Sequence, residues 1–468
     1  MNRYQKLGWN TLIISIGNFG TKFMAFLMVP FYTFFLSPSE YGKADLYVIA
    51  ISVLVPVCTL SIGDALFRFS VNNNENQKKI FSTAMLIPTL MAGVIICSAP
   101  IVELMFNQTI YYWMFILLLL LQSINTIFQQ YIRAIGKLIL YSSIGIVSSI
   151  VLFGSSVIFL KNFSMGIKGY LLAQIITVFI SMCIYFFVGK LWAFFNYRLI
   201  DLKTLKFMSN YSIPLIPNAV MWWVMLMSDR YIISFFMGTA ATGIYLVASK
   251  IPSVLSLIHG TFMQAWHLSA IENAGSDGRI FYAQIFYVYF VLLGTISSVL
   301  IIIIEPLTNL IFSEAYQSVW QYTPLLLLSI LFLSLSSFLE AYYIVEKKTV
   351  RLMRTTIIGA FVNIILTVLM VPFIGITGAC MATFISFFIT WFIRSIETRL
   401  FDFLRYKAIF VSSVLILIFQ SVLLTYTSGD FMLLQGICAA IFISINIFPI
   451  KKFLIGYRKT IKKKMMKN

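Results

Sequence analysis

Charged side chains inside long apolar segments are the residues of this sequence best suited to chemistry. The run from 221 to 252 holds Asp229, Arg230 and Lys250 on the two sides of a small-residue turn at 238–242. At about 1.5 Å per residue, Arg230 and Lys250 lie at similar depths below that turn. Intramembrane charges are costly and usually face a bundle interior or a watery cavity. If the surroundings are lipid, these residues are therefore candidates for function.

Two further cations lie in the first part of the chain. Lys22 is near the middle of an apolar run at 10–36, and Arg68 is near the end of a run at 44–70. Cations lining a cleft can bind an anion because they replace its lost hydration, and Arg offers phosphate a bidentate fork. The alternative for Lys22 is a structural pair. For Arg68 it is snorkelling or pairing with Asp64, which precedes it at i,i+4.

The acidic residues of these runs have two competing interpretations. Asp229 and Arg230 are adjacent and point about 100° apart on a helix, so they do not simply neutralise each other. Lys250 can pair with Asp229 and leave Arg230 available to an anion, whereas the alternative is a structural clasp between the two helices. Asp64, Asp229 and Glu340 are candidates for ion coupling or for charge partners, of which salt bridges are the commoner.

Composition establishes that the surroundings are lipid. Of 468 residues, 60% are hydrophobic and 11% are charged, and the mean hydropathy is +0.92. Soluble proteins have about 25% charged residues. Long unbroken apolar runs predict helices rather than the alternating strands of a β-barrel. The sequence therefore predicts an all-α polytopic membrane protein. Its net charge of +18 does not indicate nucleic-acid binding, because the basic residues lie mainly in alternate loops.

The apolar runs predict about 14 transmembrane helices. We place them at 10–36, 44–70, 80–106, 110–132, 138–160, 169–191, 207–236, 241–268, 280–304, 320–345, 352–372, 376–396, 406–427 and 430–450. With both termini cytoplasmic, only Lys43, Lys161 and Lys168 fall in outer loops, as the positive-inside rule requires. Arg394 is counted with the inner side. The loops hold no separate domain, so the activity is expected between the helices.

Similar motifs recur in both halves of the chain. The outer turn at 36–42 corresponds to the turn at 237–243, and Gly166-Ile-Lys-Gly169 corresponds to Gly375-Ile-Thr-Gly378. The same order in both halves predicts a parallel repeat, as in several transporter folds. We expect two six-helix lobes, 1–206 and 207–400, around a central cleft. A helix pair and a basic tail, 401–468, follow them.

The motifs together resemble a known family. They are Gly17-Asn-Phe-Gly20 with Pro30-Phe-Tyr, Ser39-Glu-Tyr-Gly-Lys-Ala-Asp45, Gly63-Asp-Ala-Leu-Phe-Arg-Phe69, Ser228-Asp-Arg-Tyr-Ile-Ile-Ser234 and Gly243-Ile-Tyr-Leu-Val-Ala-Ser-Lys250. They are similar to the polysaccharide repeat-unit (O-antigen-type) flippases of the multidrug/oligosaccharidyl-lipid/polysaccharide exporter superfamily. The resemblance implies outward transfer of an undecaprenyl-pyrophosphate-linked oligosaccharide across the bacterial cytoplasmic (inner) membrane. It also implies membrane lipids, a polysaccharide polymerase and a chain-length regulator as partners.

On this interpretation Lys22, Arg68, Arg230 and Lys250 form a cationic cleft for the head group. The competing functions are a lipid II-type flippase, a drug/cation antiporter and a membrane enzyme. An antiporter for cationic drugs favours acids in the cleft, and a polymerase or ligase favours a large outer loop, which this chain lacks. We predict no catalytic residue, cofactor or metal site. His259 and His267, eight residues apart, are interpreted as hydrogen-bonded packing groups rather than ligands.

Overall fold

The structure is a computed structural model of the chain. It describes residues 3–71, 77–106, 110–272, 278–346, 348–426 and 432–465, and its regular secondary structure in these ranges is helical. The chain divides into two compact units, Met1–Tyr231 and Ile232–Asn468. The boundary falls inside a helix, downstream of the predicted repeat boundary at 206/207, and that predicted boundary stays a prediction.

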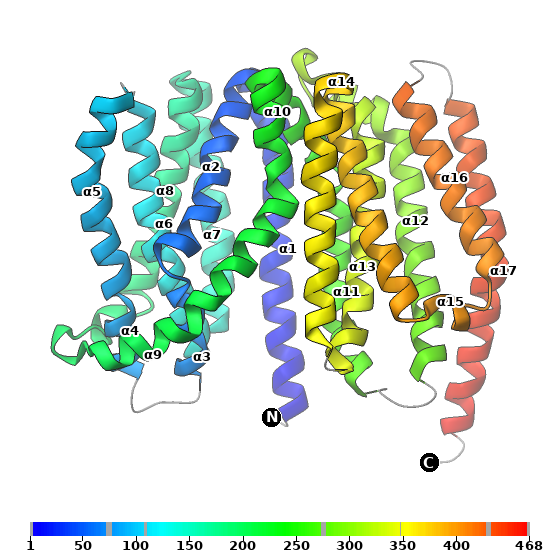
Figure 1. Ribbon diagram of the computed structural model, residues 1–468, viewed down its shortest axis with the longest axis horizontal. Helices are drawn as coiled ribbons and strands as arrows, with labels where there is room; N and C mark the ends of the chain where they lie inside the picture. Colours follow the sequence, from blue (N-terminus) through cyan, green and yellow to red (C-terminus); the bar gives the residue numbers. More distant parts are fainter. Residues whose placement is uncertain are drawn as a thin grey trace. The chain divides into compact units, whose positions relative to one another are not determined.

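The first unit consists of nine complete α-helices and the start of a tenth (Figure 1). Their bounds are α1 Arg3–Phe35, α2 Pro38–Cys58, α3 Ile62–Ser70, α4 Gln77–Ala84, α5 Leu86–Phe106, α6 Ile110–Ala134, α7 Leu138–Ser156, α8 Gly166–Phe187, α9 Leu202–Ser212 and α10 Ile216–Lys250. Its buried core brings α3, α4, α6 and α8 together around Phe81 and Tyr131, whose ring centroids are 4.4 Å apart.

The second unit begins within α10 and continues through seven further helices. They are α11 Ser253–Glu272, α12 Gly278–Ile311, α13 Val319–Val345, α14 Thr349–Glu397, α15 Leu400–Phe403, α16 Lys407–Tyr426 and α17 Met432–Met465. Its core is aromatic: Trp266 stacks on Phe338 at 4.2 Å, and Phe332 meets Trp391 at 5.2 Å.

Membrane-length helices confirm the predicted fold class. Eleven helical segments in the described ranges are long and apolar enough to cross a membrane, and two shorter apolar segments occur at Phe19–Phe35 and Ser253–Met263. Two of the eleven, in α10 and α14, are interrupted by non-helical backbone at Gly238 and at Ile374–Gly375. The predicted count of about 14 is reached when each interrupted segment is counted as two spans and Phe19–Phe35 is added. Ser253–Met263 then belongs with the second half of α10 to the predicted span 241–268, which is broken between Lys250 and Ser253.

Several predicted boundaries are wrong in detail. The expected span 44–70 is broken between α2 and α3, where Leu60 and Ser61 adopt positive φ. The expected start of a span at 207 lies within α9, a separate helix that is followed by a 3₁₀ turn containing Pro214. The predicted last span, 430–450, corresponds to the apolar part of α17, Met432–Lys452, and the helix continues through the basic residues of the tail to Met465.

The α14 segment is a helical hairpin. Asn363 faces Thr383, with Nδ2 and Oγ1 3.4 Å apart, and Thr355 faces Arg394, whose Nε donates to the threonine oxygen at 3.0 Å. The contacting residues are closer together in the sequence the nearer they lie to residue 375. The two halves of α14 therefore run antiparallel, with the turn at 375. Gly375 has φ +61, so it supplies the left-handed conformation that the turn requires.

Both units use the repeated glycine motif in the same way. Gly166 and Gly375 each have positive φ, and a Cβ on either would touch the other outer turn of its own unit, at Glu40 or at Met237. The second glycines, Gly169 and Gly378, would each place a Cβ against the residues preceding the motif. The two motifs therefore have similar backbone surroundings, and the predicted repeat stays a prediction.

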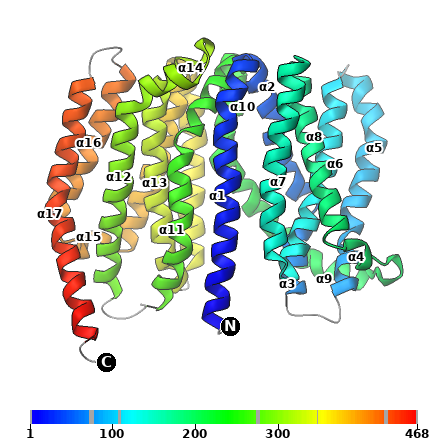
Figure 2. The ribbon, with the colours of Figure 1, turned by 180° about the vertical axis from the view of Figure 1, so that it is seen from behind.

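The last two membrane helices dock on α12 through buried polar groups. In Figure 2, α16 and α17 lie beside α12. Ser298 donates to Gln420 at 2.7 Å, Tyr287 donates to Asn446 at 2.6 Å, and Asn446 donates to Ser413 at 2.8 Å. Interhelical hydrogen bonds of this kind hold helices together where lipid removes the hydrophobic driving force.

The short helix α9 is fastened to α4. Asp201 is its N-cap and accepts from the amides of Lys203 and Thr204 at 3.1 and 3.2 Å, while Lys79 lies 2.8 Å from the same carboxylate. Lys79 and these hydrogen bonds hold the pKa of Asp201 below its usual range. The amide of Asp201 donates in turn to Thr83 of α4 at 3.2 Å.

We expect Gly378→Ala to lower stability by roughly 1–3 kcal/mol, since overpacking costs that much. A Cβ at this position would lie 2.7 Å from the backbone of Met370. The measurement is the melting temperature of the purified protein in detergent. Gly436→Ala is the matched control, because a Cβ there meets nothing within 4 Å. Equal melting temperatures for both variants would contradict the close approach.

We expect the contribution of Asp201 to stability to depend on pH. Because its folded-state pKa is depressed, the contribution is fully present above the unfolded pKa of about 3.9 and is lost as pH falls through the folded value. Asp201→Ala should therefore melt a few degrees below the wild type from pH 5 to 8, with a shrinking difference below pH 4. A difference that is unchanged at pH 3 would contradict the ionised cap.

Candidate functional site

A buried ion pair joins α2 to the first half of α10. Arg230 Nη1 lies 2.8 Å from Asp45 Oδ2, and the two residues are only 8% and 6% exposed. Charge pairs in such surroundings persist only where geometry and hydrogen bonding compensate for desolvation. The pair is therefore a structural connection within the first unit.

Hydrogen bonds on both sides of the pair fix the register of the two helices. Tyr231 donates to the carbonyl of Leu46 at 2.8 Å, and Trp223 donates to the carbonyl of Ile49 at 3.1 Å. The contacts pair residues 45, 46 and 49 of α2 with residues 230, 231 and 223 of α10, respectively. Because the later residue of α2 contacts the earlier residue of α10, the two segments run antiparallel. The rings of Trp223 and Tyr231 also lie 5.7 Å apart.

This pairing gives Arg230 a partner that the sequence analysis did not name. Its guanidinium is bound to Asp45 of α2, and the role of Arg230 in anion binding stays a prediction. The alternative of a clasp between the two helices that flank the turn at 238–242 also stays a prediction. Asp45 was not predicted as a partner of Arg230, although it ends the motif Ser39-Glu-Tyr-Gly-Lys-Ala-Asp45. Its position directly before the apolar run that begins at Leu46 could have indicated a buried acid.

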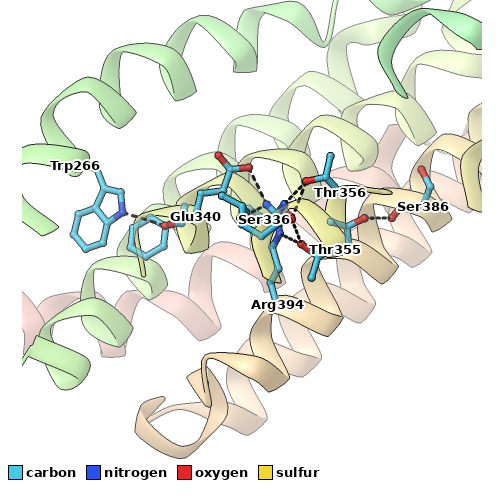
Figure 3. A network of polar contacts seen from close by, with 10 residues as sticks. Trp266, Ser336, Glu340, Thr355, Thr356, Ser386 and Arg394 are labelled. Atoms are coloured by element: carbon cyan, nitrogen blue, oxygen red, sulfur yellow. Dashed lines mark hydrogen bonds and ion pairs between the residues drawn. The ribbon is translucent and has the colours of Figure 1, made fainter. Parts of the chain in front are cut away.

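A second buried network, in the other unit, surrounds Arg394. Figure 3 shows this side chain projecting from the second half of the α14 hairpin toward α13 and the first half of the hairpin. Its Nε donates to Thr355 at 3.0 Å, Nη2 donates to Thr356 at 2.9 Å, and Nη1 donates to Glu340 at 2.9 Å and to the carbonyl of Ser336 at 3.1 Å. Arg394 is 2% exposed, and its donors are directed to acceptors on two helical segments, α13 and the first half of α14.

Glu340 is therefore a charge partner, one of the two roles predicted for it. Arg394 was missed because its position near the end of a span placed it with the inner-side basic residues. Near it, Glu397 accepts from Tyr343 at 2.8 Å and from Arg354 at 2.9 Å. These contacts extend the polar connection between α13 and α14 to the end of the hairpin.

Lys22 lies in a different environment from the two arginines. Gly17 and Gly20 let α1 approach α7 closely, since a Cβ on Gly17 would lie 2.6 Å from Ser142. Lys22 is on the opposite side of α1 from these glycines and is exposed. Among the described residues it forms no ion pair. An exposed ammonium within an apolar helix favours a water-accessible surface.

Arg68 and Asp64 are also exposed, on the short helix α3. Asp64 does not pair with Arg68 in the described structure. It accepts instead from Gln130 Nε2 of α6 at 3.3 Å, and the same glutamine accepts from Arg133 at 3.0 Å. The predicted i,i+4 pair is thus replaced by a relay to α6, and Arg68 projects from the opposite end of α3.

The remaining candidates occupy separate places. Asp229 is buried on α10, and Lys250, half-buried, is the last residue of that helix. The predicted pairing between them stays a prediction. His259 is hydrogen-bonded to Tyr289 at 2.6 Å, as expected of a packing group, while the side chain of His267 lies outside the described residues. The described part holds no cluster of three metal-ligating side chains.

Membrane-length helices with charged side chains buried between them define the architecture of a multi-pass membrane protein. Residues 7–267 match the model of the family described as polysaccharide biosynthesis protein. The chain belongs to this family. No curated protein matches it.

Solved structures of two kinds share the fold. The lipid II flippase MurJ in an inward closed conformation aligns with a TM-score of 0.69 at 15% identity, covering 96% of this chain and 100% of the flippase. A point mutant of the Vibrio cholerae MATE transporter VcmN aligns with a TM-score of 0.57 at 14% identity, covering 84% and 96% of the two chains. A MATE transporter in complex with MaL6 gives 0.58 at 11% identity, with the same coverage.

We expect Arg230→Met to lower stability by about 3–5 kcal/mol, because it leaves Asp45 buried without its partner. The double variant Arg230→Met/Asp45→Leu should recover much of that loss, since no unpaired charge remains. Melting temperatures in detergent measure both. Glu346→Gln, which breaks the exposed pair with Lys348, is the control and should change stability by less than about 1 kcal/mol. A double variant no better than the single one would contradict the role of the pair.

Proposed function

We propose that the protein is a flippase that moves an undecaprenyl-pyrophosphate-linked oligosaccharide repeat unit, an O-antigen or other surface polysaccharide precursor, to the outer leaflet of the bacterial cytoplasmic membrane. Both termini are cytoplasmic in this proposal. Membership in the polysaccharide biosynthesis family supports the substrate class, and the fold shared with a lipid II flippase supports transport of a lipid-linked sugar. The function is transport rather than an enzymatic transformation of the sugar.

The observation that carries this proposal is the exposed ammonium of Lys22 within the apolar segment Phe19–Phe35 of the helix α1. The pyrophosphate of the substrate must pass through a region of low dielectric constant, where its lost hydration has to be replaced. A cation presented on a helix surface at this depth can supply part of that replacement. The lipid tail meanwhile remains in the bilayer.

The contacts of the four predicted cations and of Arg394 suggest two different roles. Arg230 and Arg394 are buried and bound to Asp45 and Glu340, so we assign them to holding helices together. Lys22 and Arg68 are exposed, and Lys250 is half-buried. We assign these three to the substrate head group. The acids Asp64 and Asp229 stay candidates for ion coupling in this scheme.

A lipid II-type flippase is the second candidate. The alignment with MurJ over the full length of that protein favours it. A drug/cation antiporter has weaker support, since only the fold is shared with MATE transporters. The two flippase proposals share the role of Lys22 and differ in the glycan attached to the pyrophosphate.

We expect Lys22→Gln to reduce surface polysaccharide at least about tenfold, because the loss of one charge-assisted contact costs more than about 1.4 kcal/mol. Lipid-linked repeat units should accumulate in the membrane. The measurement is immunoblotting of surface polymer together with chromatography of extracted polyprenyl-linked sugars. Lys22→Arg should retain most of the activity.

Lys43→Gln is the matched control, since Lys43 is an exposed lysine of the same unit near the start of α2. Equal membrane levels of all variants must accompany the comparison. Normal polymer display with Lys22→Gln would overturn the cationic mechanism. If Lys22→Gln instead causes lipid II to accumulate and growth to stop, while surface polymer stays normal, the protein would be assigned as a lipid II-type flippase.

A further inference from the structure

Exposed basic and apolar side chains alternate over one surface of the first unit, between the end of α8 and the middle of α9. We call this surface the α9 platform. Its exposed members are the basic residues Lys190, Arg198, Lys203 and Lys206 and the apolar residues Trp192, Phe195, Tyr197, Leu199, Leu202 and Phe207. The apolar members reach far out of the fold, since Leu202 is 70% exposed and Tyr197 is 67% exposed.

The platform is held in a defined conformation. The amide of Asn196 donates to Ser82 at 2.9 Å, the Asp201 cap joins Lys79, and Met208 on the inner face of α9 is fully buried in the core. The outward side chains are therefore presented by a fixed backbone. Asp201, the one acid among residues 188–213, is already bound to Lys79, so the charge presented outward is positive.

The direction of α9 places this surface at a membrane boundary. Figure 1 shows α9 running across the lower ends of α3 and α4, nearly at right angles to α5 and α6. The helix α6 and the segment Gln77–Ile95 are candidate membrane spans, whereas α9 is not. A helix lying across the ends of spanning helices lies along the interface, where amphipathic segments rich in Lys, Arg and aromatic residues bind.

We propose that the α9 platform binds the head groups of anionic phospholipids in the leaflet at this end of the unit. Its basic side chains attract the lipid phosphates, and its aromatic rings occupy the head-group level that Trp and Tyr prefer. The interleaving of charge and apolar surface favours lipid over a protein partner, because the centres of protein interfaces are depleted of charged residues.

The first test is native mass spectrometry of the full-length protein in detergent, titrated with phosphatidylglycerol or phosphatidylcholine. We expect the wild type to prefer phosphatidylglycerol. The triple variant Arg198→Gln/Lys203→Gln/Lys206→Gln should lose at least about tenfold in affinity for it, since each basic residue near an anionic surface contributes about fivefold. The charge-conserving variant Arg198→Lys/Lys203→Arg/Lys206→Arg should keep the preference.

The matched control is Lys43→Gln/Lys161→Gln/Lys168→Gln, which removes three exposed charges of the same unit outside the platform. A second measurement uses liposomes with brominated phosphatidylglycerol and records the quenching of Trp192 as the difference between the wild type and Trp192→Phe. Equal losses in the two triple variants, or no quenching of Trp192, would overturn the proposal. The absence of quenching is also the outcome expected if the platform instead binds a protein.

Discussion

The cost of placing a charge in a medium without water governs this structure. Each buried arginine meets an acid of its own unit: Arg230 meets Asp45, and Arg394 meets Glu340. Removing one member of such a pair costs several kcal/mol, whereas the pair itself contributes little beyond specificity. The two pairs therefore fix which helices lie side by side. Apolar side chains alone would not fix how far one helix is shifted along the other, because they pack equally well against lipid and against a neighbouring helix.

The two units share an arrangement of glycines but not their charge pairs. Gly166 and Gly375 each have positive φ, and Gly169 and Gly378 each permit close contact with the residues that precede the motif. These are requirements of the backbone, so they do not depend on the neighbouring side chains. The ion pairs differ, because Asp45–Arg230 joins α2 to α10, whereas Glu340–Arg394 joins α13 to α14. The shared geometry is thus maintained by glycine, and the individual connections by charge.

Much of the fold follows from the sequence because the membrane imposes a length on each helix. Apolar runs and turn glycines such as Gly375 predicted the helices and the repeat. The break inside the run 44–70 could be suspected but not placed, since the residues with positive φ are Leu60 and Ser61, whereas Pro56 and Gly63, which can mark a break, lie on either side of them. The pairing of Asp45 with Arg230 could not be predicted from local sequence patterns either, because the two residues are 185 positions apart in the chain. The exposure of Lys22 depends on which face of α1 packs on α7, and the glycine spacing at 17 and 20 carried that information in advance.

The order of the ion-paired residues along the chain has a consequence for biosynthesis. In both pairs the acid precedes the arginine, by 185 residues for Asp45 and by 54 for Glu340. Synthesis from the N-terminus therefore produces each acid before the arginine that it pairs with. Each arginine then arrives when its acceptor is already in the bilayer, which removes the need to hold an unpaired cation there.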